Sequence, residues 1–410
     1  MRGHTFFLGW RLALAIFSVI LFATSSWAAP HNFGDGDNDG YLPGSGLIID
    51  AHGNLYGTTA GGGTHGDGTV FELSPRESGG WTETVLHSFG NGTDGQLPFA
   101  SLIFDGAGNL YGTTTYGGIH GYGTVFKLSP REDGTWEETV LHSFNLHDGA
   151  YPDGGLTFDA AGNLYGTTSY GGIHYNGTAF ELMPREGRGW TETVLHSFGR
   201  GTDGSNPLAG LTFDAAGNLY GTTSVGGIHN PCDGETCGTV FELSPNGSGG
   251  WTENVLHSFG RSTDGSHPFG GLIFDAAGNR YGTTQFGGYG DGTAFEMSPE
   301  EDGGWTEKVL HRFGRGTDGS NPLAGLTFDA AGNLYGTTFS GGVYNDGTVF
   351  ELSPNENGGW TDRVLHNFDL NGTDGLYSYA NLILDAAGNL YGAALYGGIY
   401  GHGIVFEITP

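Results

Sequence analysis

The first residues of this chain that suggest chemistry are three aspartates spaced like the start of a calcium-binding loop. Asp35, Asp37 and Asp39 alternate with other residues and are followed by Gly40, which gives the pattern D-x-D-x-D-G. Carboxylate oxygens at this spacing suit Ca²⁺, but the glutamate that an EF-hand places six residues after the glycine is absent, because residue 46 is Gly46. We expect no other cofactor, and ordinary turn chemistry is the favoured alternative even for these three residues.

Seven histidines and seven Asp-Gly pairs recur at matching places. The histidines stand in phrases of the form H-S-F and are His31, His87, His142, His196, His257, His311 and His366. The aspartates follow a few residues later and are Asp39, Asp94, Asp148, Asp203, Asp264, Asp318 and Asp374. If each histidine and each aspartate belongs to a separate repeat, and the repeats form a ring, these residues cannot converge on one substrate. We therefore interpret both sets as structural.

Five residues break the repetition and are the better candidates for ligand contact. They are His147, Asp153, His267, Tyr377 and Tyr379. All five lie in loops that could meet near the mouth of a central channel, where they would form a polar cluster. Catalysis by this cluster is disfavoured because drift in exposed loops produces the same pattern. We therefore predict that these five residues contact a ligand, and we assign no catalytic residue.

Aromatic residues recur beside a Gly-Gly pair in another set of loops. They are Tyr116, Tyr170, Phe286, Phe339 and Tyr396. Flat amphipathic rings suit stacking on sugars, and packing against a neighbouring segment is the competing interpretation at each position.

A long repeat must position all of these residues. Phrases close to G-N-L-Y-G-T-T begin at Gly53, Gly108, Gly162, Gly217, Gly278, Gly332 and Gly388, which are 54 to 61 residues apart. Each repeat reads as four short strands joined by turns, with apolar residues on both strand faces. A single four-stranded sheet cannot bury both faces, so the repeats must stack. The sequence predicts an all-β, seven-bladed propeller of four-stranded blades.

The two ends of the chain predict how this ring closes. The last repeat stops after its third strand, near Ile408, and so lacks its outer strand. The segment His31–Phe33 matches the end of a fourth strand. We predict that it supplies the missing strand and covers an edge that would otherwise aggregate.

Residues 1–28 read as a signal peptide, and residues 29–410 as a single propeller domain. An apolar run from Leu12 to Ala23 follows two arginines, and small residues precede a cleavage site after Ala28. Export favours a disulfide between Cys232 and Cys237, with a free or metal-bound pair as the alternative.

The charge balance narrows the partners. The whole chain has a formal net charge of −30, and loss of the two arginines in residues 1–28 would make it −32. Such a field repels phosphates, which argues against nucleic acid and anionic lipid surfaces. We expect no membrane span after cleavage of the leader, a secreted, cell-surface or periplasmic location, and a monomer.

The repeated phrase D-A-A-G-N-L-Y-G-T-T, then G-T-V-F-E-L-S-P, then W-T-E-x-V-L-H-S-F resembles the Gloeo/Verruco (GloVer) repeat of exported bacterial proteins. The similarity spans residues 31–410. It implies a secreted or surface repeat protein with no assigned activity and supplies no catalytic residues. The stretch G-L-x-F-D-A-A-G-N-L-Y also looks like the inner hairpin of NHL-type propellers, which bears on strand order alone.

The leading interpretation is an exported, non-enzymatic propeller that binds a glycan or a protein through one loop face. A propeller enzyme acting on a polysaccharide, as a lyase, or on a lactone is the alternative. It would draw on the few arginines in suitable loops, Arg200, Arg261 and Arg315. A purely structural surface or matrix protein is the third.

Overall fold

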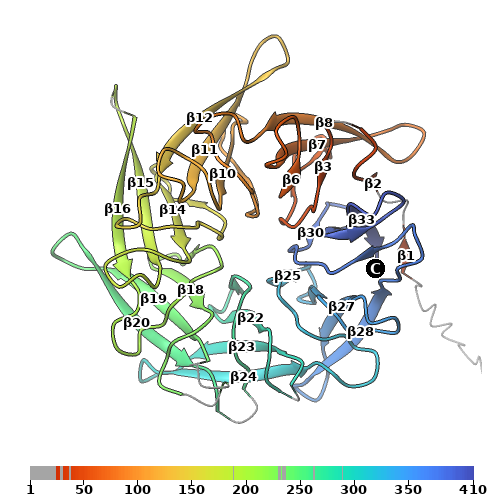
Figure 1. The fold of residues 1–410 in the computed structure, drawn as a ribbon. Coiled ribbons are helices and arrows are strands. Elements are labelled where there is room, and N and C mark those ends of the chain that lie inside the picture. The colour runs from red at the N-terminus through yellow and green to blue at the C-terminus, as the bar shows by residue number, and fades with distance from the viewer. Residues whose placement is uncertain are drawn as a thin grey trace, which may run out of the picture.

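The chain folds into a closed ring of seven small antiparallel sheets in a computed structural model (Figure 1). The structure describes residues 25–27, 31–36, 38–187, 189–229, 232, 237–261, 264–288 and 290–410. These residues form strands, turns and loops without a helix. The prediction of an all-β, seven-bladed propeller is therefore confirmed. Within the described residues, no helix is long and apolar enough to span a bilayer.

Each of the first six blades contains four strands in chain order from the axis outward. The bounds are β4 (Ile48–Ile49), β5 (Leu55–Thr59), β7 (Thr69–Pro75) and β8 (Trp81–Ser88); β9 (Ile103–Phe104), β10 (Leu110–Thr114), β11 (Thr124–Pro130) and β12 (Trp136–Ser143); β13 (Thr157–Phe158), β14 (Leu164–Thr168), β15 (Thr178–Arg185) and β16 (Gly189–Ser197); β17 (Thr212–Phe213), β18 (Leu219–Thr223), β19 (Thr239–Pro245) and β20 (Trp251–Ser258); β21 (Ile273–Phe274), β22 (Arg280–Thr284), β23 (Thr293–Pro299) and β24 (Trp305–Arg312); β25 (Thr327–Phe328), β26 (Leu334–Thr338), β27 (Thr348–Pro354) and β28 (Trp360–Asn367).

The seventh blade is completed by the start of the chain. Its own strands are β30 (Ile383–Leu384), β31 (Leu390–Ala394) and β33 (Ile404–Thr409). Strand β2 (His31–Asn32) pairs with β33, which confirms the predicted closure. Strand β1 (Ser26–Trp27) also pairs with β33, although it lies inside the segment predicted to be cleaved. Residues 1–24 and 28–30 lie outside the described residues, so the boundary after Ala28 stays a prediction.

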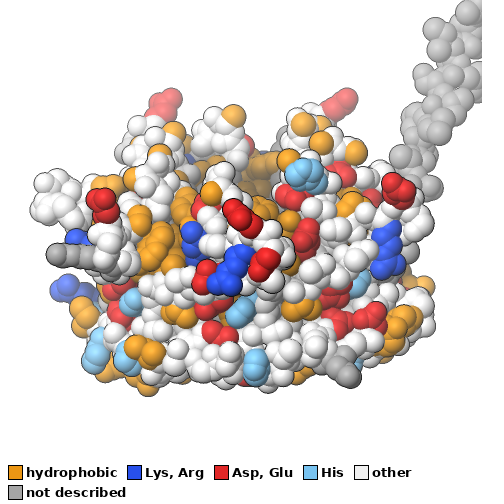
Figure 2. Space-filling model, turned by 90° about the horizontal axis from the view of Figure 1, so that it is seen from above, with side chains coloured by type: hydrophobic (Ala, Val, Ile, Leu, Met, Phe, Trp, Pro, Cys, Tyr) orange, Lys and Arg blue, Asp and Glu red, His pale blue; other side chains and the backbone are white. Residues whose placement is uncertain are grey.

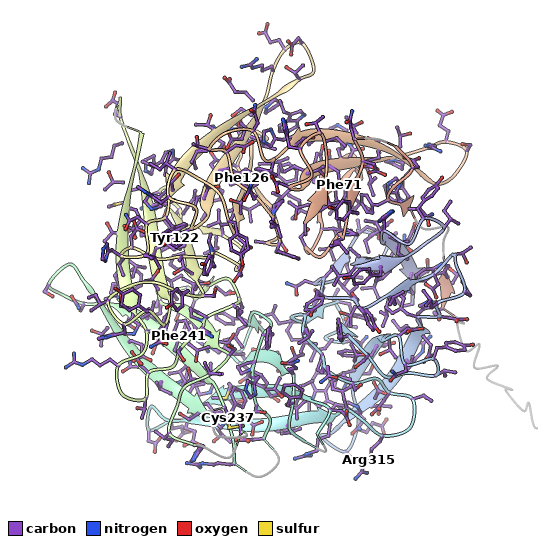
Figure 3. The ribbon with its side chains drawn as sticks, in the orientation of Figure 1. Phe71, Tyr122, Phe126, Cys237, Phe241 and Arg315 are labelled. Atoms are coloured by element: carbon purple, nitrogen blue, oxygen red, sulfur yellow. A yellow bond between two sulfur atoms is a disulfide. The ribbon has the colours of Figure 1, made fainter. Side chains whose placement is uncertain are left out.

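Phenylalanine side chains join every blade to the next. The phenylalanine that follows each outer strand meets one from the third strand of the following blade. Ring centroids are 4.9 to 5.3 Å apart in the pairs Phe33–Phe71, Phe89–Phe126, Phe144–Phe180, Phe198–Phe241, Phe259–Phe295, Phe313–Phe350 and Phe368–Phe406. Phe71, Phe126 and Phe241 are fully buried and lie within the ring of blades (Figure 3). The apolar core therefore lies between blades, and an isolated blade would expose it.

The repeated phrase forms a hairpin held by one aspartate. Asp105 accepts hydrogen bonds from the backbone amides of Ala107 and Asn109, both 2.9 Å long, and from the side chains of Asn109 and Tyr111. The first threonine of a following Thr-Thr pair reaches the next blade, as where Thr167 Oγ1 donates to the Ala209 carbonyl at 2.8 Å. The motif therefore encodes both a turn and an inter-blade contact.

Cys232 and Cys237 form the predicted disulfide in the longest repeat. Because the bridge closes a loop of only a few residues, we expect the double substitution Cys232→Ala/Cys237→Ala to lower the free energy of unfolding by about 2 kcal/mol. Urea unfolding without reductant measures this loss. Adding reductant should destabilise the wild type but not the variant, and equal stability of the two oxidised proteins would contradict the expectation.

Candidate functional site: the loop face and the channel mouth

One face of the ring collects two sets of loops, which we call the loop face. Loops from the fourth strand of one blade to the first strand of the next pair with loops between the second and third strands. In two blades these loops form short strand pairs: β3 (Gly40–Tyr41) pairs with β6 (Gly61–Gly62), and β29 (Gly375–Leu376) pairs with β32 (Tyr396–Gly397). Single bridges at the other five blades repeat this pairing, among them Ala150 with Tyr170. These main-chain bonds hold the loops in fixed positions.

The loop face carries every large apolar side chain that is exposed among the described residues. The sixteen are Tyr41, Phe99, Tyr116, Ile119, Tyr170, Ile173, Tyr175, Ile228, Phe286, Val343, Tyr344, Leu370, Tyr379, Tyr396, Ile399 and Tyr400. Half of them are tyrosines. In an edge-on view, hydrophobic and histidine side chains lie along the lower margin. Acidic side chains lie at the ends of some loops that project from the upper margin, and these loops also carry hydrophobic side chains (Figure 2).

A rim of seven residues with left-handed backbone surrounds the axis on this face. Their φ angles lie between 54° and 61°, and they are Leu42, Leu97, Tyr151, Asn206, His267, Asn321 and Tyr377. This conformation is costly for residues other than glycine and persists where the surroundings impose it. At Tyr151 the amide donates to the Tyr122 carbonyl of the preceding blade, and the carbonyl accepts from the Ser169 amide, both at 2.9 Å. Backbone bonds therefore hold the rim whatever its side chains.

Two residues farther along each loop, a second set of seven positions lines a cavity of about 330 Å³ on the axis. We call these positions the wall; they are Gly44, Phe99, Asp153, Leu208, Phe269, Leu323 and Tyr379. In the sequence, each wall residue is followed by one or two small residues, which lie at the inner end of the blade. A Cβ atom on Gly154 would lie 2.7 Å from the backbone of Ala209, so glycine is required for this close approach.

Asp153 is the only acidic or basic residue among the described residues that line the cavity, apart from the phenol of Tyr379. Its Oδ1 accepts a hydrogen bond from Thr115 Oγ1 and its Oδ2 one from Ser169 Oγ, both 2.8 Å long. Burial raises the pKa of Asp153, and the two hydroxyls, which favour the carboxylate, counteract this only in part. The carboxyl group is thus fixed in place by two blades.

Two groups of aromatic side chains flank the channel mouth. The tyrosine patch, on the second and third blades, comprises Tyr116, Tyr122, Tyr151, Tyr170 and Tyr175. Tyr151 lies at its centre, with its ring centroid 5.1 Å from that of Tyr116 and 6.1 Å from that of Tyr170.

The second group lies on the sixth and seventh blades. Phe339 stacks on Tyr377 with 4.5 Å between ring centroids and meets Tyr379 edge-on at 5.0 Å. Phe339 is partly buried and stands one residue earlier in its repeat than the exposed Tyr116, Tyr170 and Phe286. Phe339 therefore packs at the rim. The other four aromatic residues grouped with it in the sequence also contact rim residues, but they are more exposed.

The structure places four of the five predicted ligand-binding residues on the wall or the rim, and two of these four line the cavity. Asp153 and Tyr379 belong to the wall, and His267 and Tyr377 to the rim. His147 is exposed in a separate turn and is not among the cavity residues. Tyr151, Phe99 and Phe269 were missed by the sequence reasoning, although each stands beside a proline just before the small-residue pair, a signal that marks these positions in six of the seven blades.

The repeated aspartates and histidines hold the loops. Asp203 accepts the Gly199 amide at 3.1 Å and meets His196 Nε2 at 3.0 Å, and equivalent pairs recur around the ring. Asp39 likewise accepts the amides of Gly34, Asp35 and Gly40. Asp37 lies outside the described residues, and the described residues contain no group of three acidic, histidine or cysteine side chains suited to a metal. Calcium binding stays a prediction.

Arginines of the loop face lie away from the cavity. Arg315 projects from the outer margin of the ring (Figure 3). Arg261 Nε donates to His229 Nε2 at 2.9 Å. Arg200 and these two residues are not among the cavity residues, so an acidic sugar on the axis would meet no arginine there.

Comparison with solved structures supports the fold at low sequence identity. The extracellular domain of a putative hybrid two-component system from B. thetaiotaomicron has a TM-score of 0.54 and 12% identity over 92% of this chain and 39% of that chain. The extracellular domain of a putative one component system from the same organism has a TM-score of 0.53 and 12% identity over 93% of this chain and 42% of that chain. The chain thus spans about two fifths of these proteins, and the likeness concerns the fold alone.

The match to a luciferin-regenerating enzyme covers 93% of this chain and 95% of that chain at 12% identity. Its TM-score is 0.43, which is too low to support a comparison of the two folds. No curated protein sequence matches the chain. A family model described as the Gloeobacter/Verrucomicrobia repeat matches residues 15–233 and 233–410.

Proposed function

The chain belongs to the Gloeobacter/Verrucomicrobia repeat family, and from this premise we propose that it is an exported, non-enzymatic propeller that binds glycans through its loop face. One observation carries the proposal: all sixteen exposed large apolar side chains of the described residues lie on that face, and half are tyrosines. Tyrosine offers a flat ring and a hydroxyl at low conformational cost, which suits stacking on sugars. The disulfide between Cys232 and Cys237 supports a location outside the cytoplasm.

A protein ligand is the second candidate, and a different set of residues favours it. Ile119, Ile173, Ile228, Val343 and Ile399 occupy one repeat position at the tips of the loops and are 56 to 79% exposed. Exposed aliphatic residues contact protein surfaces better than they contact sugars. An enzyme is less well supported, because the phenol of Tyr379 is the only titratable side chain besides Asp153 among the described residues that line the cavity.

The tyrosine patch gives the sharpest test. We expect wild-type protein to be retained on at least one neutral insoluble polysaccharide, such as cellulose, xylan, mannan or chitin, without releasing new reducing ends. The double substitution Tyr116→Ala/Tyr170→Ala should weaken retention roughly tenfold or more, since each stacking contact contributes about 0.5–1.5 kcal/mol. Depletion assays across a range of polysaccharide concentrations measure this.

His52→Ala is the matched control, because His52 is an exposed residue of a hairpin on the opposite face, where other blades have alanine. It should bind like the wild type. Equal loss in both variants, or no retention of the wild type on any of the four polysaccharides, would reject glycan binding and leave the protein ligand as the better proposal.

A further inference from the structure

The wall of the cavity offers one polar anchor among apolar surfaces. Phe99, Phe269 and Tyr379 supply rings, Leu208 and Leu323 supply aliphatic surface, and Gly44 supplies no side chain. The Phe99 ring lies over Gly44, where an added Cβ would come within 3.3 Å of it. A ligand on the axis would therefore meet ring and aliphatic faces on most sides and the carboxyl group of Asp153 on one side.

Asp153 keeps part of its hydrogen-bonding capacity for a ligand. A carboxylate has about four acceptor sites, and the two bonds from Thr115 and Ser169 use one on each oxygen. The remaining site on each oxygen suits donors carried by neighbouring carbon atoms. Adjacent hydroxyl groups of a pyranose ring have this arrangement. Since the two protein hydroxyls come from different blades, the carboxyl group is oriented before any ligand arrives.

The size and depth of the cavity select the part of a glycan that can enter. Its volume of about 330 Å³ is at the small end of the range for ligand pockets, which begins near 300 Å³. A polysaccharide lying across the loop face would contact the rim residues, such as Tyr151 and Tyr377. Only a chain end can descend past the rim to the wall.

Charge selects neutral sugars. The described residues that line the cavity include no lysine, arginine or histidine, and the whole chain has a formal net charge of −30. A uronate or sulfate group placed on the axis would lose its hydration without gaining a cationic partner.

We propose that the channel mouth binds the terminal residue of a neutral glycan chain, with two adjacent hydroxyls donating to Asp153 and a ring face against the aromatic wall. This inference rests on the proposed function and adds the site and the chemical class of the sugar. It predicts that affinity depends on chain ends and not on polymer length.

The test is isothermal titration calorimetry with neutral hexasaccharides of glucose, mannose, galactose and xylose, and with hexagalacturonate as the acidic probe. Asp153→Leu is the main variant, because Leu208 and Leu323 occupy the same wall position in other blades, so the fold should accept it. Asp153→Asn retains the size of the side chain. Glu132→Leu, in an exposed hairpin of the opposite face, is the matched control. Thermal unfolding checks that each variant folds.

We expect at least one neutral hexasaccharide to bind with one site per protein, Asp153→Leu to weaken it at least about tenfold, Asp153→Asn to weaken it less, and the control to bind like the wild type. Hexagalacturonate should not bind. If the wild type is retained on a polysaccharide but Asp153→Leu and Asp153→Asn bind like the wild type, or no hexasaccharide binds, the terminal-sugar site is wrong while glycan binding by the loop face stands. If retention itself fails, the proposed function fails first.

Discussion

Removing residues 25–33 is expected to leave the chain largely unfolded or aggregated. Phe33 is fully buried between the last and first blades, and loss of such a side chain alone costs about 3–5 kcal/mol. The deletion also removes the pairing of β1 and β2 with β33 and so exposes an edge strand. The total approaches the whole stability of a typical domain, which is about 5–15 kcal/mol. Urea unfolding and light scattering measure both effects.

Two comparisons separate the parts of this closure. A chain starting at Ser25 should match the stability of the full chain, and Phe33→Ala within it should lose about 3–5 kcal/mol. A chain starting at Ala29, the predicted mature end, lacks β1 and the stacking of Trp27 on His366, whose ring centroids are 4.0 Å apart. It should be intermediate. If the variant without residues 25–33 unfolds at the same urea midpoint as the full chain, the ring closes without this segment.

The stability of the ring is expected to fall as pH rises from about 5 to 9. Five carboxyl groups on the outer strands lie against the preceding blade, and burial raises the pKa of Glu138, Glu253 and Glu307 to about 7, of Glu192 to about 8 and of Asp362 to about 6. One oxygen of each is buried without a hydrogen-bond partner in the described structure. Ionisation in the folded state is therefore unfavourable.

The sign of this pH dependence follows from whether the folded or the unfolded state binds the proton more tightly. These groups keep their protons to higher pH when folded, so their full contribution is present below the ordinary glutamate pKa of about 4.3 and is lost as pH rises through 6 to 8. The hairpin aspartates act oppositely: burial alone would raise the pKa of Asp105, but its hydrogen bonds to Asn109 and Ala107 lower it. Their contribution is lost in stronger acid, so stability should peak between about pH 4 and 6.

Glu192→Gln provides the matched variant. The neutral amide has nearly the same shape, and Glu192 lies near Asp148, whose charge also raises its pKa. We expect the variant to equal the wild type at pH 5 and to exceed it at pH 9 by about 1 kcal/mol, after allowing for solvent screening of this partly exposed group. Urea unfolding across this pH range measures the difference. Destabilisation by Glu192→Gln at both pH values would show that the carboxylate is instead a favourable partner in its ionised form.

Much of the fold was predictable because each repeated residue makes the same contacts in every blade. The G-N-L-Y-G-T-T phrase marks a hairpin whose aspartate, asparagine and tyrosine bond one another, and the unmatched strand near Ile408 implied a partner from the start of the chain. Strand β1 was not predicted, because Ser26 and Trp27 also fit a leader. The outer-strand carboxylates were missed as well. Glu138 and Glu192 alternate with other polar residues and so resemble solvent-facing positions, and only the neighbouring blade buries them.

The candidate site was predictable only in part. Asp153, His267, Tyr377 and Tyr379 stood out as departures from the repeat, and the structure places them around one axis. His147 stood out equally, but it is exposed in a turn and does not line the cavity. Tyr151 is marked in the sequence only by the neighbouring Pro152, which does not reveal that the left-handed backbone of the rim places it among four other tyrosines.

The rim has a consequence for how such proteins diversify. Its seven residues share one backbone geometry, held by main-chain bonds, yet include leucine, tyrosine, asparagine and histidine. Because main-chain hydrogen bonds hold this geometry, exchanging a rim side chain should leave the backbone in place, so mutation can change the side chains that face a ligand without remodelling the loop. The same seven positions are suitable sites to randomise in a directed-evolution library built on this scaffold.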